Sequence, residues 1–125
     1  MNPSNRARTL LIVEDNKDVR SIFAEVFQGV GYRVLEAANG EDALHVMATA
    51  LDPVNVVLTD LRMPVMDGLE LATRIKGDTR FSGIPVVLLS ATPMTNSWQA
   101  LDVFSALLTK PCSFDRLLST VDGVQ

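Results

Sequence analysis

Short apolar runs alternate along the chain with longer stretches in which apolar residues recur every three or four positions. Each run is rich in Val, Leu and Ile and ends in polar or turn-forming residues, which is typical of a strand covered on both faces. The stretches between the runs have the spacing of one face of an α-helix. We therefore predict five strands, at residues 9–13, 33–37, 56–58, 85–89 and 106–109.

The helical spacing is clearest after the first strand, where a helix should begin near Asp18 and stop at Gly29 and Gly31. Its predicted buried face consists of Val19, Ile22, Phe23, Val26, Phe27 and Val30. Further helices are predicted at residues 40–51, 69–76 and 114–121. Between the last two strands the pattern is ambiguous, because Pro93 could begin a helix, capped by Thr92 or Thr95, or keep the chain extended.

Strict alternation of strands and helices predicts an α/β fold, a doubly wound parallel sheet with right-handed crossovers and helices on both faces. In such a sheet the carboxyl ends of the strands meet at one rim, which is where ligands bind. Polar residues that can do chemistry stand at four of these strand ends. They are Glu14, Asp15, Asp60, Ser90 and Lys110.

Three carboxylates, a hydroxyl and an ammonium at one rim would form a site of hard oxygen ligands with one compensating cation. Clustered carboxylates repel one another, and Mg²⁺ suits a shallow site that leaves several waters on the ion. An ionised Asp60 could act as a nucleophile toward a phosphoryl group, whose charge the metal, Lys110 and Ser90 would spread. Taken alone, Asp60 could equally be a helix cap or a solvated loop acid.

Composition limits the remaining possibilities. A chain of 125 residues, 47% of them hydrophobic and 21% charged, is the size of one domain with a substantial core. The net charge of −4 argues against direct binding to nucleic acid.

The first apolar run is too short for a signal peptide or a membrane span, and the single Cys112 cannot form an internal disulfide. We therefore expect a cytoplasmic location without membrane association. Residues 1–8 are expected to be a flexible arm ahead of a folded domain at residues 9–125.

Four short motifs resemble those of the receiver (CheY-like) domain of two-component response regulators. They are VEDN at residues 13–16, TDLRMPVMDG at 59–68, LLSA at 88–91 and TKP at 109–111. The resemblance extends from Thr9 to Val121, essentially the whole chain. It implies a flavodoxin-like sheet of five parallel strands in the order 2-1-3-4-5.

The resemblance also implies a role for each residue at the rim. Asp15 and Asp60 would ligate Mg²⁺ together with the backbone carbonyl of Arg62, and Glu14 would reach the ion through water. Asp60 would accept a phosphoryl group from the phosphohistidine of a sensor histidine kinase or a histidine phosphotransfer protein.

Ser90 would bond the new phosphoryl group and Lys110 would pair with it, and the peptide bond between Lys110 and Pro111 is expected to be cis. The phosphorylated domain would then change its binding to an output protein that the sequence does not identify. The domain could be a free-standing regulator or part of a hybrid kinase.

Two departures from the family pattern concern the segment after Ser90. Leu107 stands where the family usually carries Tyr or Phe, so an aromatic ring cannot report phosphorylation there. Only 20 positions separate Ser90 from Lys110, about two fewer than is common in the family, and we expect a short or irregular fourth helix. The apolar residues of this segment could form core or a partner surface, and we favour core. They are Trp98, Leu101, Val103 and Phe104.

Two alternatives to a phosphorylated receiver remain at this point. An aspartyl-phosphate hydrolase of the haloacid dehalogenase kind would also use a strand-end Asp with Mg²⁺, but it needs a second Asp where this chain has Arg62. A receiver-like module that binds partners without phosphorylation would fit Leu107, although it would not need an intact acidic site. We interpret His45 as a solvated or packing residue and Cys112 as a small buried hydrophobe.

Overall fold

The computed structural model describes residues 7–94 and 97–125. Residues 1–6 of the arm expected at residues 1–8, and the possible cap Thr95, lie outside the described residues. The described residues form one sheet of five parallel strands in the order β2-β1-β3-β4-β5, which confirms the predicted architecture. The strands are β1 (Thr9–Val13), β2 (Arg33–Ala37), β3 (Val56–Thr59), β4 (Val86–Ser90) and β5 (Ala106–Thr109).

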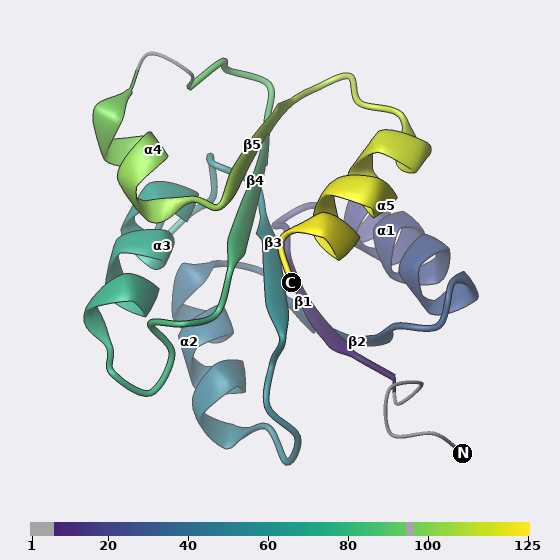
Figure 1. Ribbon diagram of the computed structural model, residues 1–125, viewed down its shortest axis with the longest axis horizontal. Helices are drawn as coiled ribbons and strands as arrows, with labels where there is room; N and C mark the ends of the chain where they lie inside the picture. Colours follow the sequence, from purple (N-terminus) through teal and green to yellow (C-terminus); the bar gives the residue numbers. More distant parts are fainter. Residues whose placement is uncertain (1–6, 95–96) are drawn as a thin grey trace.

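Helices cover both faces of the sheet (Figure 1). One face carries α1 and α5, and the opposite face carries α2, α3 and α4. The helices are α1 (Lys17–Gly29), α2 (Gly40–Thr49), α3 (Gly68–Gly77), α4 (Trp98–Val103) and α5 (Phe114–Gly123). None of the helices in the described part of the chain has the length and apolar character that crossing a membrane requires.

Alternating side chains of the central strands divide the core into two layers, as the two-residue period of a strand requires. Leu11 and Val13 of β1 pack with the residues of α2, α3 and α4, whereas Leu10 and Ile12 pack with those of α1 and α5. Because both faces of β1, β3 and β4 are covered, their sequences are almost uninterrupted runs of apolar residues. The polar residues of these three strands, Thr9, Thr59 and Ser90, stand at strand ends and are buried.

Every helix in the described residues begins with a side chain that accepts a hydrogen bond from the backbone N–H three residues later. The five capping residues are Asn16, Asn39, Asp67, Ser97 and Ser113. Each such cap contributes about 1 kcal/mol to helix stability. All five caps follow the carboxyl ends of strands, so they help to fix the loops that form the rim.

The fourth helix is short, as expected, but its apolar residues are not all in the core. α4 has six residues, Pro93 lies outside it, and Ser97 caps it instead of Thr92. Val103 and Phe104 are buried, whereas Trp98 is 75% exposed and Leu101 is 58% exposed. The prediction that all four pack inside was therefore wrong for Trp98 and Leu101, because a helix of six residues turns only one narrow face toward the sheet.

Smaller differences concern the first helix and the strand ends. Ile22 and Val30 are more than half exposed, because α1 packs through Phe23, Ala24 and Phe27, and Val30 lies beyond the last helical turn. Ser90 is the last residue of β4 and not the first residue after it.

Candidate functional site

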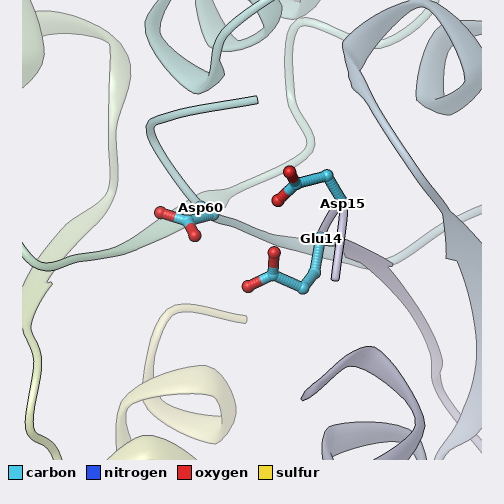
Figure 2. Close-up of side chains that lie close together, drawn as sticks. All are labelled: Glu14, Asp15 and Asp60. Carbon is cyan, nitrogen blue, oxygen red and sulfur yellow. The ribbon is translucent and has the colours of Figure 1, made fainter. Parts of the chain in front are cut away.

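The three predicted carboxylates meet at one rim of the sheet. Glu14 and Asp15 directly follow β1, and Asp60 directly follows the neighbouring β3. One carboxylate oxygen from each of the three lies within 4.8 Å of the others. Figure 2 shows Glu14 and Asp15 side by side, with their carboxylates turned toward the side where Asp60 lies. This convergence follows from the parallel pairing of β1 with β3, which brings distant parts of the sequence to the same edge.

Lys110 adds the one compensating cation that the sequence predicts. It follows β5, two strands away from β3, and its long side chain reaches back along the rim. Its Nζ lies 3.1 Å from Asp60 Oδ2 and 3.8 Å from Glu14 Oε1. The peptide bond between Lys110 and Pro111 is cis, as the family resemblance implies.

Glu14 is the most buried of the three acids. Its side chain is enclosed at the end of β1, and its Oε2 accepts a hydrogen bond from the backbone N–H of Asn16 at 3.1 Å. Burial, reinforced by the neighbouring carboxyl of Asp15, raises the pKa of Glu14 to about 7. The ionised form of Glu14 is therefore disfavoured in the metal-free site, and a cation bound beside it would favour that form.

Asp60 is held at both its backbone and its side chain. Its N–H donates to Val13 O of β1 at 3.1 Å, and its Oδ1 accepts from the N–H of Leu61 at 2.7 Å. Its other oxygen, Oδ2, is the one that contacts Lys110. These contacts hold a largely buried carboxylate at the rim, with one oxygen within 4.8 Å of a carboxylate oxygen of each acid that follows β1.

The loop after Asp60 returns close to it because Gly68 has no side chain. A Cβ at Gly68 would lie 2.2 Å from the backbone oxygen of Asp60, a distance that real contacts do not reach. The N–H of Gly68 donates to Leu61 O at 2.8 Å and closes the loop. Gly68 therefore lets the first turn of α3 pack directly against the backbone that carries Asp60.

The same loop contains a tight turn at Val65. Met66 N–H donates to Pro64 O at 2.7 Å, and Val65 has a φ of 71°, which together define a γ-turn of the rare, strained kind. Met66 is buried, and its side chain occupies the space that a Cβ at Gly40, the first residue of α2, would fill. The packing of Met66 on α2 therefore holds the turn in place despite the strain at Val65.

Ser90 and Arg62, the two remaining predicted site residues, lie at the edges of the acidic cluster. Ser90 is only 2% exposed, its Oγ accepts from Thr92 N–H at 3.0 Å, and its backbone oxygen accepts from Lys110 N–H at 2.8 Å. Arg62 lies two residues after Asp60 in the same loop, with an exposed side chain. Both residues are in the segments that enclose the rim.

Three residues that shape this rim were not predicted from the sequence. Gly68 and Met66 act through packing, and Arg20 of α1 donates a hydrogen bond to the backbone oxygen of Glu14 at 2.8 Å. The Asp67-Gly68 pair indicates a turn, but nothing in the sequence pattern indicates what the glycine contacts. Arg20 occupies an ordinary polar position of an amphipathic helix, and the pattern carries no signal of its contact.

The donor set of the rim suits a hard divalent cation. Its candidate ligands are carboxylate oxygens, and Mg²⁺ prefers oxygen ligands and usually keeps several waters. The acids come from two rigid strand ends, so little reorganisation is needed to bring them around an ion. The residues present therefore fit a bound Mg²⁺.

Comparisons with known proteins show which family the chain belongs to. The model of the response regulator receiver domain matches residues 10–122. Sensor histidine kinase TmoS of Ectopseudomonas mendocina is 39% identical over 84 residues, which cover 67% of this chain and 8% of that protein. The phosphate regulon transcriptional regulatory protein PhoB of Pseudomonas aeruginosa is 34% identical over 119 residues, which cover 94% of this chain and 51% of that protein. The chain thus spans from less than a tenth to about half of the length of these two relatives.

Solved structures of response regulators also resemble this chain. The chemotaxis response regulator CheY4 of Vibrio cholerae superposes with a TM-score of 0.85 at 27% identity, covering 95% of this chain and 99% of that one. Response regulator TrrA of Thermotoga maritima, solved in complex with Mg²⁺ and BeF, has a TM-score of 0.84 at 26% identity, covering 94% of this chain and 99% of that one. Together with the match over residues 10–122, these likenesses show that the chain belongs to the response regulator receiver domain family of two-component signalling.

Proposed function

We propose that this receiver domain, residues 9–125, takes a phosphoryl group from a partner's phosphohistidine onto Asp60. The observation that carries this proposal is the position of Asp60: its carboxylate contacts Lys110 Nζ at 3.1 Å and belongs to the cluster formed with Glu14 and Asp15. The ammonium of Lys110 places a positive charge beside the carboxylate that would attack the phosphorus atom. In this proposal Glu14 and Asp15 help to hold a metal, and Asp60 alone receives the phosphoryl group.

In the proposed transfer, a carboxylate oxygen of Asp60 forms a bond to phosphorus while the bond between phosphorus and the imidazole nitrogen of the donor breaks. The electron pair of that bond stays on the imidazole nitrogen, which takes up a proton from solvent. Asp60 is left as an acyl phosphate. Reaction of this acyl phosphate with water would return the carboxylate and release inorganic phosphate.

Asp15 and Asp60 would hold Mg²⁺ together with the backbone carbonyl of Arg62, and Glu14 would contact the ion through water. When bound, Mg²⁺ would neutralise part of the charge on the phosphoryl oxygens. The chemistry of the donors supports this assignment, because carboxylates are the ligands that a hard cation selects.

Lys110 and Ser90 would bind the phosphoryl group once it is on Asp60. Lys110 already contacts Asp60, and its ammonium would pair with a phosphoryl oxygen. Ser90 Oγ accepts a hydrogen bond from Thr92 N–H, so the hydroxyl proton of Ser90 remains available for donation to the phosphoryl group. A small movement of Ser90 would also move the backbone of Thr92 and the segment that follows it.

This coupling suggests how phosphorylation changes binding to an output protein. Leu107 offers no aromatic ring to reorient, so we expect the signal to travel through the backbone after Ser90 toward α4. The exposed side chains of Trp98 and Leu101 would form part of the partner surface. Hydrogen exchange with and without beryllofluoride should change protection in residues 91–94 and 97–105; changes confined to the loops of Asp15 and Asp60 would exclude this route.

The proposed phosphodonor is a sensor histidine kinase or a histidine phosphotransfer protein of the same cytoplasmic compartment. Sensor histidine kinases and response regulators among the relatives support this assignment. The net charge of −4 argues against direct contact with nucleic acid. We therefore expect the output to be a change in protein binding.

Intact mass after incubation with Mg²⁺ and acetyl phosphate tests whether Asp60 is needed for phosphorylation. The wild type should gain one phosphoryl group and Asp60→Asn should gain none. Asp67→Asn is a matched control, because Asp67 lies in the same loop and caps α3 with a side-chain oxygen that Asn retains. Equal phosphorylation of the wild type and Asp60→Asn would overturn the proposal.

A further inference from the structure

Arg20 connects the acidic loop to the edge of the sheet. It lies in the first turn of α1, and its guanidinium donates from Nη1 to the backbone oxygen of Glu14 at 2.8 Å and from Nε to Glu36 Oε1 at 3.2 Å. Its side chain is 17% exposed, although it is the longest and most polar side chain on that part of the helix. A planar guanidinium with several fixed donors can satisfy both acceptors at once.

The contact to Glu14 completes a set of restraints on a single residue. Glu14 N–H donates to Ala37 O of β2 at 3.0 Å, and Glu14 Oε2 accepts from Asn16 N–H at 3.1 Å. Arg20 fixes the remaining backbone group, the carbonyl of Glu14. That carbonyl and the N–H of Asp15 belong to one planar peptide unit. The direction of the carbonyl therefore determines the orientation of the backbone at Asp15.

The restraint matters for Asp15 because this acid is exposed at the tip of the loop. Among the ion pairs of the described residues, Arg20 pairs with Glu36, and the acids of the cluster pair with Lys110. Arg20 therefore does not neutralise the acidic cluster by pairing with its carboxylates. Its contribution to the rim is to direct the backbone that carries them.

We propose that Arg20 is a positioning residue that orients the Glu14–Asp15 peptide so that Asp15 faces Asp60 and is preorganised for Mg²⁺. Glu36 on β2 anchors the guanidinium, so the position of the acidic loop depends on the edge strand as well as on β1. This inference rests on the magnesium site of the proposed function. It adds to that site a residue that would not contact the metal or the phosphoryl group.

Magnesium titration of the unphosphorylated protein, followed by NMR at Asp15 and Asn16, tests the role of Arg20. Arg20→Met keeps the apolar stem and removes both hydrogen bonds, so it should weaken Mg²⁺ binding about tenfold, the lower end of the effect of losing a group that orients metal ligands. Arg20→Lys should recover only part of the affinity, because one nitrogen cannot reproduce the two-pronged contact. Arg74→Met is the matched control, since Arg74 forms an exposed ion pair with Glu70 on α3, and its affinity should equal that of the wild type.

Two further readouts separate positioning from a general loss of stability. In the metal-free protein, the amides of Asn16 and Val19 should exchange faster in Arg20→Met than in Arg74→Met, whereas the amides of β4 should be unchanged. At saturating Mg²⁺, the rate of phosphorylation of Arg20→Met by acetyl phosphate should return to the wild-type rate, because Asp60 is untouched.

Three results would overturn the assignment: Mg²⁺ affinity and loop exchange of Arg20→Met equal to the wild type, complete rescue by Arg20→Lys, or a reduced rate that saturating Mg²⁺ does not restore. A wild type that does not bind Mg²⁺ would instead contradict the proposed function, which keeps the two failures distinguishable.

Discussion

The connections that leave β3 and β4 lie at the same rim but are built very differently. After β3, the chain is held by the hydrogen bond from Gly68 to Leu61, by the buried Met66 and by contact between Gly68 and the Asp60 backbone. It then enters α3, a helix of ten residues. After β4, it enters α4, a helix of six residues that leaves Trp98 largely exposed. The side that carries the acid is tightly fixed, whereas the side next to Ser90 leads into a short helix with an exposed aromatic side chain.

Burial shows the same contrast. α3 fully buries Leu71, Ala72 and Ile75, whereas α4 buries only Ala100 and Val103. Each fully buried Leu or Ile contributes about 1.5–3 kcal/mol, so α3 is attached to the sheet more firmly than α4. A receiver needs a fixed reaction site and an element that responds to it. Under the proposed function, the connection after β3 would provide the reaction site and the connection after β4 the responsive element.

The largest effect expected on the fixed side is the loss of a metal ligand. Asp15→Asn removes one negative charge from the cluster, and Mg²⁺ affinity should fall by on the order of 100-fold. Asp18→Asn is the control, because Asp18 is exposed in the first turn of α1 and outside the cluster. Isothermal or NMR titration measures both; equal affinity of Asp15→Asn and the wild type would place the metal elsewhere.

The close contact at the start of α3 gives the next largest effect. Gly68→Ala would force a Cβ against the backbone oxygen of Asp60, and we expect a loss of about 2–3 kcal/mol in the free energy of unfolding. Gly77→Ala at the other end of the same helix meets no atom within 4 Å and should stabilise the protein by about 0.5–1 kcal/mol. Urea denaturation measures both changes, and a Gly68→Ala variant as stable as the wild type would show that the loop is not tightly held.

The pKa of Glu14 predicts a pH dependence of metal binding. Between about pH 4.5 and 7 the folded, metal-free protein binds more protons at Glu14 than the unfolded chain does, so this group lowers stability as the pH rises. Mg²⁺ favours the ionised acid, so its affinity should increase about fivefold from pH 6 to pH 7 and level off above about pH 8, with close to one proton released per ion at pH 6. The dependence should be much weaker in Glu14→Gln; an affinity independent of pH in the wild type would contradict the burial argument.

The smallest effect is expected at the exposed side of α4. Trp98→Ala should change the free energy of unfolding by no more than about 0.5 kcal/mol, because the side chain is 75% exposed. Phe104→Ala removes a buried side chain between α4 and β5 and should cost about 3–5 kcal/mol. Thermal or urea unfolding separates the two, and a large loss for Trp98→Ala would mean that Trp98 is part of the core.

Most of the architecture could be predicted because each element carries its own signal. The apolar runs of β1, β3 and β4 reflect burial on both faces, and strict alternation with helices determines a parallel sheet. The meeting of Glu14, Asp60 and Lys110 follows from that topology alone, although they are far apart in the sequence. The acidic cluster could therefore be predicted from the sequence.

The features that could not be predicted depend on which side of an element faces a neighbour. Trp98 and Leu101 are apolar, and a six-residue helix does not have enough turns for the spacing to identify its buried face. Likewise, the role of Gly68 depends on a close approach to Asp60, and the contact of Arg20 with Glu14 depends on a helix rotation. Neither leaves a periodic pattern in the sequence.

The most direct test of the central claim is to locate the phosphoryl group on the chain. Borohydride reduces an acyl phosphate to an alcohol, so a phosphorylated Asp becomes homoserine, which tandem mass spectrometry identifies by position. After incubation with Mg²⁺ and acetyl phosphate, homoserine should appear at residue 60 of the wild type and at neither Asp15 nor Asp67. Homoserine at another acid, or none at residue 60 in a protein that has gained a phosphoryl group, would contradict the account.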